Sequence, residues 1–458
     1  DVESMQYSFS FSPELDQEWD WTEKYAPQPE ILKYANHVAD RFDLRRDIVF
    51  DTRVTSAVFD EQTNLWNIET DKGEKVGARF CIMAVGCLSS ANKPAFKDIE
   101  KFEGPIYHTG EWPHDGVDFT GKRVGVIGTG SSAIQSIPII AQQAKTLTVF
   151  QRTPNYSVPA RNADLSPEYR AEVKARYPEL RAKARARPTG FYFKFNGAPA
   201  LAASPEERKK QYEEAWTEGG LPFLGSYGDL LFDKKANDTI ADFAREKIRG
   251  IVKDPATAEL LCPDNVFGCK RLCVDTDYYA TYNLPHVKLV DVSKTPVEKF
   301  TAKGVVVNGK EYEFDAVVCA TGFAAMTGSF DRMNIVGRGG LTLRKKWEAG
   351  PRAYLGLASA GFPNLFMITG PGSPSVLASM IQAIEQHVDW IADCIAHMRD
   401  IGAATIEPTI PEEDAWVEHV TDVSKISLRS TCSSWYVGAN IPGRPRVFMP
   451  YIGGFPIY

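Results

Sequence analysis

A glycine-rich turn between two regular elements is the first feature of the sequence that could do chemistry. Residues 123–127 have the composition of a buried strand, and residues 131–143 have the pattern of a helix. Gly128 would permit a tight turn, Gly130 would let a pyrophosphate approach the backbone, and Ala133 would let helix and strand pack closely. The helix N-terminus would supply unpaired N–H groups and a partial positive charge. We therefore predict a dinucleotide site formed by Gly128, Thr129, Gly130, Ser131, Ser132 and Ala133.

An arginine stands at the end of the next expected strand, where it could select between two dinucleotides. Residues 147–150 have the character of that strand, and Gln151-Arg152-Thr153 follows. A site for NAD would place an acidic residue near this point to bind the ribose hydroxyls, whereas an arginine suits the 2′-phosphate of NADP. Arg152, with Thr153 beside it, is therefore predicted to bind that phosphate. The alternative interpretation is an ordinary surface arginine.

The composition is that of a globular protein and argues against several classes of partner. The chain has 458 residues, of which 43% are hydrophobic and 24% are charged, with a formal net charge of −7. This charge does not favour nucleic acid or an anionic membrane surface, and no apolar stretch has the length of a membrane span. Residues 1–25 do not resemble a signal peptide, and the cysteines lack zinc spacing. We expect a cytoplasmic protein with no metal site, no nucleic-acid partner and no membrane partner.

Hydrophobic patterning predicts that strands and helices alternate along the chain. Before the glycine turn, a helix is expected at residues 29–42, and strands at 48–50, 53–59, 66–70 and 80–84. After it, charged helices are expected within residues 162–262, and strands at 287–290, 304–307 and 316–319. A long amphipathic helix should follow Gly370, with Ser373 as its N-cap and Pro374 as its first residue.

A second string with fixed order and spacing lies just before the glycine turn. It consists of Phe102, Gly104, His108, Trp112 and Pro113. This order resembles the fingerprint Phe-x-Gly-x-x-x-His-x-x-x-Trp-Pro of the Baeyer–Villiger monooxygenases. Other stretches that look like this family are residues 267–272, 319–323, 361–366, 370–375 and 434–443. The resemblance therefore covers essentially the whole chain, and it implies that His108 supports the arrangement of the domains rather than the chemistry.

The resemblance implies an α/β fold of two intertwined Rossmann-like nucleotide-binding domains with a helical insertion. Residues 1–90 would form the first part of an FAD domain, and residues 322–458 would form its second part. Residues 91–321 would form the NADP-binding domain, with the helical insertion at about residues 162–262.

The resemblance also assigns roles to residues outside the glycine turn. Lys270 would join Arg152 at the 2′-phosphate, and Arg271 would lie against the flavin and the nicotinamide. A guanidinium is permanently charged, so Arg271 would stabilise the negative charge that develops during oxygen transfer. Asp1 would pair with Arg271 and orient it. Trp435 would lie on a mobile loop that closes over the nicotinamide.

The implied activity is insertion of an oxygen atom next to a ketone carbonyl, which gives an ester or a lactone. The cofactors would be FAD and NADPH, and the partners a small-molecule ketone and O2, with the protein a monomer or a weak homo-oligomer. The sequence does not specify which ketone is used. A flavin monooxygenase that oxidises nitrogen or sulfur is an alternative, against which the Trp112-Pro113 ending and the Lys270-Arg271 pair both argue.

A second glycine turn, which a flavin enzyme should carry near its N-terminus, is not found after Asp1. We therefore expect an incomplete FAD domain, because the segment with that turn would precede Asp1, and family members continue beyond the equivalent of Tyr458. This expectation leaves another alternative open, in which the chain is a truncated fragment that binds NADP but is catalytically inactive.

Overall fold

The computed structural model describes residues 2–458, so Asp1 lies outside the described residues. The described chain is an α/β protein that divides into two compact units. Unit 1 contains residues 90–161 and 193–323, and unit 2 contains residues 2–89, 162–192 and 324–458. Both units are therefore assembled from segments that are far apart in the sequence.

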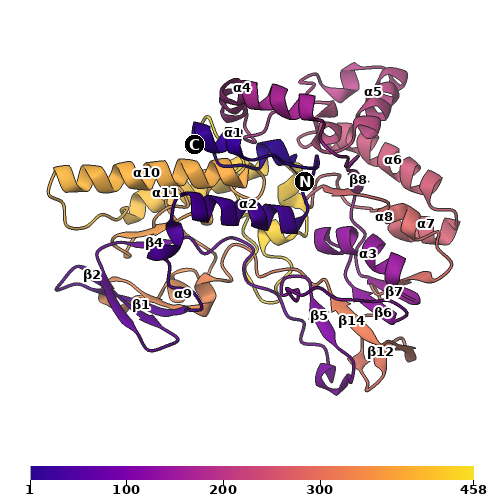
Figure 1. The fold of residues 1–458 in the computed structure, drawn as a ribbon, viewed down its shortest axis with the longest axis horizontal. Helices are drawn as coiled ribbons and strands as arrows, with labels where there is room; N and C mark the ends of the chain where they lie inside the picture. Colours follow the sequence, from indigo (N-terminus) through magenta and orange to yellow (C-terminus); the bar gives the residue numbers. More distant parts are fainter. Residues whose placement is uncertain (1) are drawn as a thin grey trace. The chain divides into compact units, whose positions relative to one another are not determined.

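Unit 1 is built on a five-stranded parallel sheet with the strand order β10-β7-β6-β14-β5 (Figure 1). Helix α3 (Ser131–Gln143) connects β6 to β7 in the manner of a Rossmann unit. The strands of this sheet are β5 (Ile106–His108), β6 (Arg123–Ile127), β7 (Thr146–Gln151), β10 (Val287–Asp291) and β14 (Ala316–Cys319). The fold of this unit is thus the one that the glycine turn predicts.

Alternate residues of these strands point to two separate hydrophobic clusters. Val124 and Val126 of β6 belong to a cluster with Ile134 of α3, whereas Ile127 belongs to another cluster with Phe150. This alternation is the two-residue period of a strand buried on both faces. The second cluster also includes residues of a three-stranded antiparallel sheet formed by β11 (Lys299–Phe300), β12 (Gly304–Val307) and β13 (Lys310–Glu313).

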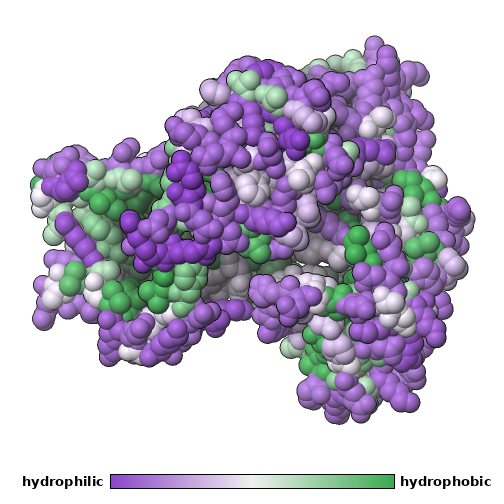
Figure 2. All heavy atoms as spheres, in the orientation of Figure 1, coloured by the Kyte–Doolittle hydropathy of each residue, from purple (hydrophilic) through white to green (hydrophobic). Residues whose placement is uncertain are grey.

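The rest of unit 1 is helical, and its helices begin where the sequence offers good N-caps. Ser204 caps α5 and Asp233 caps α6, each by accepting backbone N–H groups of the first turn. The surface over α5 is largely hydrophilic (Figure 2), in agreement with its many charged residues. The remaining elements are α5 (Pro205–Glu218), α6 (Lys234–Ile251), α7 (Pro255–Leu261), α8 (Tyr278–Thr281) and the parallel pair β8 (Ser157–Pro159) and β9 (Cys273–Asp275).

Unit 2 contains two small sheets and the longest helix of the described chain. The sheets are a four-stranded one with the order β15-β1-β2-β3 and a parallel pair, β16-β4. The strands are β1 (Val54–Asp60), β2 (Leu65–Thr70), β3 (Lys75–Ala78), β4 (Cys81–Met83), β15 (Asn334–Val336) and β16 (Leu365–Met367). The helices are α1 (Pro13–Glu18), α2 (Gln28–Arg41), α4 (Pro167–Arg185), α9 (Leu343–Lys346), α10 (Met380–Asp400) and α11 (Ile410–Lys425).

Most of the elements expected from the sequence are present, and one strand is not. The expected helix at 29–42 corresponds to α2, and the glycine turn lies between β6 and α3 as predicted. The expected strand at 48–50 is wrong, because these residues form an exposed loop that leads into a turn at Asp51, whose φ is +52°. The charged stretch at 162–262 is helical as expected, but its first helix, α4, belongs to unit 2 and the others belong to unit 1.

The predicted start of the long amphipathic helix is also wrong. Helix α10 begins at Met380, and its N-cap is Ser379 rather than Ser373. The carbonyl oxygen of Ser373 accepts from the backbone N–H of Tyr451 at 3.0 Å, and its hydroxyl donates to the carbonyl oxygen of Gly370 at 2.7 Å. These bonds hold residues 370–373 in a turn, so the N-cap of the helix lies six residues after the position that local capping preference suggests.

No helix within residues 2–458 combines the length and the apolar character needed to cross a membrane. These residues also contain no group of three or more His, Cys, Asp or Glu side chains that could hold a metal ion.

The packing of α3 against the sheet leads to a stability prediction. Ile134 is fully buried in the cluster between α3 and the sheet, whereas Ile139 on the same helix is 55% exposed. Ile134→Ala should lower the free energy of unfolding by about 2–5 kcal/mol, because it leaves a cavity in a close-packed core. Ile139→Ala is the matched control and should change it by about 0.5 kcal/mol or less. Urea denaturation measures both, and equal losses in the two variants would contradict this packing.

Candidate dinucleotide site

The glycine turn of unit 1 has the geometry that a dinucleotide site requires. Gly128 adopts a φ of +113°, and a Cβ atom there would overlap the carbonyl oxygen of Ala320 on the neighbouring strand connection. Gly130 has an extended backbone, and a Cβ added there would have no heavy atom within 4 Å. Gly128 is therefore required by the fold, whereas Gly130 leaves its backbone open to a ligand.

Helix α3 presents an uncapped N-terminus at this turn. Gly130 is its N-cap residue, and no side chain accepts a hydrogen bond from the first turn. Thr129 donates its hydroxyl to the carbonyl oxygen of Thr153 at 3.0 Å, which ties the turn to the segment after β7. Ala133 is fully buried against the sheet. The free N–H groups and the helix dipole make this end of α3 suitable for an anion.

Arg152 and Lys270 come from distant parts of the sequence and lie close enough for their charges to interact. Arg152 follows β7 and is exposed, whereas Lys270 is only partly exposed. Burial, and then the positive charge of Arg152, hold the pKa of Lys270 below its usual range. Asp264 opposes this shift. Two cations that repel each other near a helix N-terminus are suited to a ligand with a doubly charged anionic group.

Lys270 and Arg271 belong to a loop that is anchored beside the same helix N-terminus. The loop leads into β9, whose first residue is Cys273. The Cys273 sulfur lies 3.1 Å from the hydroxyl oxygen of Ser131, the first residue of α3. Burial raises the pKa of the Cys273 thiol to about 11, so this cysteine is a packing group rather than a nucleophile. The predicted partner of Arg271, Asp1, lies outside the described residues.

The histidine of the fingerprint string has a structural environment. His108 is buried at the end of β5, where its Nδ1 accepts from the backbone N–H of Gly110 at 3.0 Å. Its Nε2 lies 3.2 Å from the hydroxyl of Thr321, which donates to the carbonyl oxygen of Asn92. Burial lowers the pKa of His108, so the ring stays neutral near pH 7. His108 therefore joins the segment before β5 to the end of β14.

Packing also accounts for the residue types at two other fingerprint positions, Gly104 and Trp112. A Cβ atom at Gly104 would lie 2.7 Å from the ring of Phe102 and 2.8 Å from the carbonyl oxygen of Asp315. Trp112 packs on Tyr107, with ring centroids 5.8 Å apart. The fingerprint thus determines how the chain enters and leaves the edge strand β5.

Unit 2 contains the remaining predicted site residue, Trp435, and the strained turn at residues 369–373. Trp435 is partly buried and packs against a hydrophobic cluster that includes Val376 and Tyr436. Ser375 directly precedes Val376, and Ser434 directly precedes Trp435. The side-chain oxygens of these two serines are buried and have no hydrogen-bond partner within the described residues. Unpaired buried hydroxyls of this kind are costly unless a ligand or water satisfies them.

A chain of hydrogen bonds holds the strained turn of unit 2. Thr369 and Leu355 have φ values of +55° and +54°, which are unfavourable for residues with such side chains. The N–H of Thr369 donates to Nδ1 of the fully buried His387 at 3.0 Å, and Nε2 of His387 lies 3.2 Å from the Tyr458 hydroxyl. That hydroxyl donates to the carbonyl oxygen of Leu355 at 2.5 Å. Burial lowers the pKa of His387 to about 4, so the acceptor nitrogen stays available at neutral pH.

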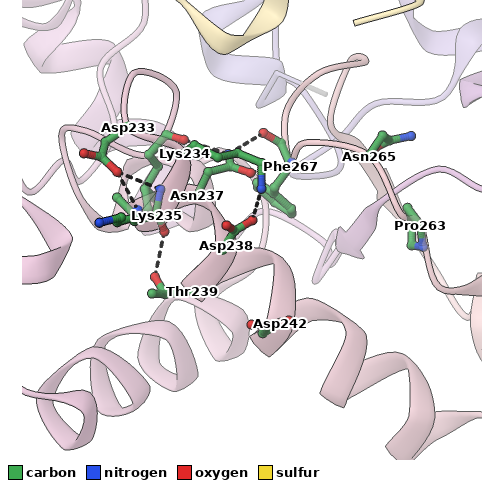
Figure 3. Close-up of polar contacts among 12 residues, drawn as sticks. Asp233, Lys234, Lys235, Asn237, Asp238, Thr239, Asp242, Pro263, Asn265 and Phe267 are labelled. Atoms are coloured by element: carbon green, nitrogen blue, oxygen red, sulfur yellow. Dashed lines mark hydrogen bonds and ion pairs between the residues drawn. The ribbon is translucent and has the colours of Figure 1, made fainter. Parts of the chain in front are cut away.

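Sequence reasoning missed the residue that anchors the start of the Lys270 loop. Asn237 lies on the buried face of α6 and is fully buried. Its side chain bonds to the main chain of Phe267, three residues before Lys270 (Figure 3). The sequence does contain one indication of this role: Asn237 is a polar residue on the same helical face as the apolar residues Ile240, Ala241, Ala244 and Ile248.

Similar proteins have been characterised, and the similarity extends over the whole chain. The family described as pyridine nucleotide-disulphide oxidoreductase matches residues 5–188. A Baeyer–Villiger monooxygenase of Pseudooceanicola batsensis is 43% identical over 100% of this chain and 84% of the relative. A phenazine N-monooxygenase of Lysobacter antibioticus is 41% identical over 100% of this chain and 84% of the relative.

Solved structures share this fold closely. An oxidised steroid monooxygenase bound to NADP is 56% identical, with a TM-score of 0.95 over 100% of this chain and 86% of that chain. A complex of OTEMO with FAD and NADP is 38% identical, with a TM-score of 0.96 over 100% of this chain and 86% of that chain.

The two glycines of the turn should respond differently to the same substitution. Gly128→Ser should lower the free energy of unfolding by about 2 kcal/mol or more, because the side chain meets Ala320 and the backbone is left-handed. Gly130→Ser should change it by about 0.5 kcal/mol or less, since serine is a good N-cap and the space is open. Urea denaturation of both variants tests this, and a destabilised Gly130→Ser protein would show that the space is not open.

Proposed function

We propose that this chain, which belongs to the Baeyer–Villiger monooxygenase family, inserts one oxygen atom of O2 next to the carbonyl of a ketone. The product is an ester or a lactone, and the cofactors are FAD and NADPH. The observation that carries this proposal is the uncapped N-terminus of α3, where the segments that contain Arg152 and Lys270 are bound through Thr153 and Cys273, in a chain that is similar to a family member over its whole length.

The residues of unit 1 fit NADP. Two interacting cations suit the dianionic 2′-phosphate, which NAD lacks. The open backbone at Gly130 and the uncapped start of α3 suit the pyrophosphate. We assign the 2′-phosphate to Arg152, Thr153 and Lys270, and the pyrophosphate to Gly128, Thr129, Gly130, Ser131, Ser132 and Ala133.

The residues of unit 2 fit a second polar ligand. The buried hydroxyls of Ser375 and Ser434 have no partner within the described residues, and Ser375 follows the strained turn at 369–373. We assign this region to FAD. The chemistry that FAD supplies when bound is the transfer of electrons from NADPH to O2. The family resemblance assigns to Trp435 the closing of a loop over the nicotinamide.

Arg271 is the residue to which we assign stabilisation of negative charge during oxygen transfer. A guanidinium keeps its charge at all accessible pH values and donates several hydrogen bonds in a fixed geometry. Such a group lowers a barrier where negative charge develops in the transition state. Asp1 is assigned to hold Arg271 in orientation, as the resemblance implies.

The substrate, the cellular location and the assembly state belong to the same proposal. A steroid monooxygenase is 56% identical, so a steroid ketone joins small cyclic ketones as a first test substrate. We place the protein in the cytoplasm, where NADPH is available, as a monomer or a weak homo-oligomer. The net charge of −7 supports the absence of nucleic-acid and anionic membrane partners.

Oxygenation of nitrogen is the second candidate function, because a phenazine N-monooxygenase is 41% identical over the whole chain. The two candidates share the cofactors and differ in the atom that is oxidised. A ketone is attacked at an electrophilic carbon, whereas a ring nitrogen attacks an electrophilic oxygen. The two therefore need different protonation states of the oxygen-transferring species.

The reaction is tested with purified protein, FAD, NADPH and isotopically labelled O2. Flavin absorbance that bleaches on addition of NADPH should accompany cofactor binding. Cyclohexanone or a steroid ketone should then yield a lactone or ester that contains one labelled oxygen atom, as measured by mass spectrometry. Formation of a labelled N-oxide from a phenazine, with no ester from any ketone, would favour the second candidate.

Removal of the Lys270 charge should weaken the preference for NADP. Lys270→Met keeps most of the side-chain length and should raise the Kd of NADP⁺ about tenfold to a hundredfold, the effect of losing one charge-assisted hydrogen bond. The Kd of NAD⁺ should change about twofold or less. Binding is measured by calorimetry with the two dinucleotides, and Lys288→Met, at an exposed position of β10, is the matched control.

The lowered pKa of Lys270 also predicts how the Kd of NADP⁺ depends on pH, and the Lys270→Met variant tests this dependence. Because the pKa of Lys270 lies below its usual range, Lys270 loses its charge earlier than an ordinary lysine as the pH rises. The Kd of NADP⁺ should therefore rise as the pH passes through that lowered pKa, and the Lys270→Met variant should not show this rise. An alkaline increase that is identical in both proteins would assign it to another group.

A further inference from the structure

The loop that carries Lys270 and Arg271 is short and is fixed at its C-terminal end. Only residues 268–272 separate Phe267 from Cys273, the first residue of β9. Strand β9 pairs in parallel with β8, and the Cys273 sulfur lies 3.1 Å from the hydroxyl of Ser131. The position of the N-terminal end of this loop, at Phe267, is therefore one of the determinants of where the two cations lie.

Asn237 holds that end through the backbone of a single residue. Its side-chain oxygen accepts from the N–H of Phe267 at 2.9 Å, and its Nδ2 donates to the carbonyl oxygen of Phe267 at 2.9 Å. The same Nδ2 donates to the carbonyl oxygen of Leu230 at 2.7 Å. Figure 3 shows the Asn237 amide facing the main chain of Phe267. This closed pair of hydrogen bonds fixes both the position and the direction of the chain at Phe267.

Only a carboxamide of this length matches the three backbone groups. A carboxylate would face two carbonyl oxygens without a proton to donate, and an aliphatic side chain would leave one N–H and two carbonyl groups unpaired. The position is fully buried on a face that Ile240, Ala244 and Ile248 otherwise occupy. A polar group there is unfavourable unless its hydrogen bonds are complete, and in this case they are directed at the loop rather than at the helix.

A second set of contacts fixes the chain just before Phe267. The Tyr156 hydroxyl lies 3.1 Å from the carbonyl oxygen of Pro263 and 3.3 Å from that of Asn265. Arg245, on the same helix as Asn237, donates to the Tyr156 oxygen at 2.8 Å and to the carbonyl oxygen of Pro263 at 3.1 Å. The Phe267 ring, which is fully buried, packs on Tyr156 with centroids 4.9 Å apart. Residues 263–267 thus form a rigid base for the loop.

We propose that Asn237 is a positioning residue, which sets the register of the loop so that Lys270 lies beside Arg152 and Arg271 is held at a defined place. This inference rests on the proposed function, because it assigns to Lys270 the 2′-phosphate of NADP. Asn237 does not itself touch the ligand. Its effect on the ligand passes through the backbone of Phe267 and the short segment that follows.

The experiment compares two substitutions on helix α6. Asn237→Ser removes the three bonds to the main chain of Leu230 and Phe267. Thr239→Val is the matched control, because the Thr239 hydroxyl lies 2.7 Å from the Tyr212 hydroxyl on α5 and donates to the carbonyl oxygen of Ala236 within α6, away from the loop. Both variants should unfold at lower temperature than the wild type. Asn237→Ser alone should raise the Kd of NADP⁺ about tenfold, with a change of about twofold or less for NAD⁺.

Hydrogen exchange supplies a readout that does not depend on a variant folding. In the wild-type protein, the Phe267 amide should exchange slowly, as a buried bonded N–H does, and NADP⁺ should slow exchange of residues 268–272 further. In Asn237→Ser, exchange over residues 267–272 should accelerate, whereas in Thr239→Val it should not. Fast exchange at Phe267 in the wild type would overturn the inference even if Asn237→Ser does not fold.

The outcomes separate this inference from the proposed function. A wild-type protein that binds NADP⁺ no better than NAD⁺ would overturn the assignment of the 2′-phosphate to Arg152 and Lys270. A wild-type protein that prefers NADP⁺, together with an Asn237→Ser variant that keeps the full preference, would overturn the positioning role alone. Equal loss of preference in Asn237→Ser and Thr239→Val would do the same, since it would indicate a general effect of destabilisation.

Discussion

The placement of two like charges, Arg152 and Lys270, in one unit is a constraint that the fold of the dinucleotide unit must satisfy. Like charges move apart unless the backbone on both sides is fixed, and here each cation follows a fixed element. Arg152 directly follows β7, an inner strand of the five-stranded sheet, and Lys270 lies on a loop held by Asn237 at one end and by β9 at the other. If a doubly charged anion binds to these cations, as we propose, their positions are set by folding rather than by the ligand.

The contacts of the fingerprint residues stabilise the fold of unit 1, and none of those described involves a reacting group. Gly104 allows the chain to pass close to Phe102 and Asp315, and His108 links the segment before β5 to the end of β14. These contacts are made with neutral groups, since burial lowers the pKa of His108. The fingerprint residues Gly104 and His108 are therefore explained by close packing and hydrogen bonding within unit 1.

One hydrogen-bonded chain in unit 2 joins two residues with strained backbones, one of which lies in the segment that we assign to FAD. Thr369 and Leu355 adopt left-handed backbone conformations, and a single chain of hydrogen bonds through His387 and Tyr458 joins the two. Strain of this kind persists where the surrounding structure determines the conformation, and it is common at ligand sites. The neutral state of His387 is essential to this chain, because a protonated ring could not accept the N–H of Thr369.

The sequence by itself determined the local parts of this protein. The strand, turn and helix at residues 123–143, and the arginine after the next strand, follow from residue types within a few positions of one another, and the family resemblance follows from ordered spacing. Tertiary structure decided the rest. Ser373 was a sound local N-cap, but its backbone is bound to Tyr451, so α10 begins at Met380. Asn237 and Phe267 are thirty positions apart, and no local pattern states that a buried amide on one helix determines where a distant lysine lies. The roles of Asp1, Arg271 and Trp435 stay predictions, because each of them concerns a contact with a bound ligand or with a residue outside the described chain.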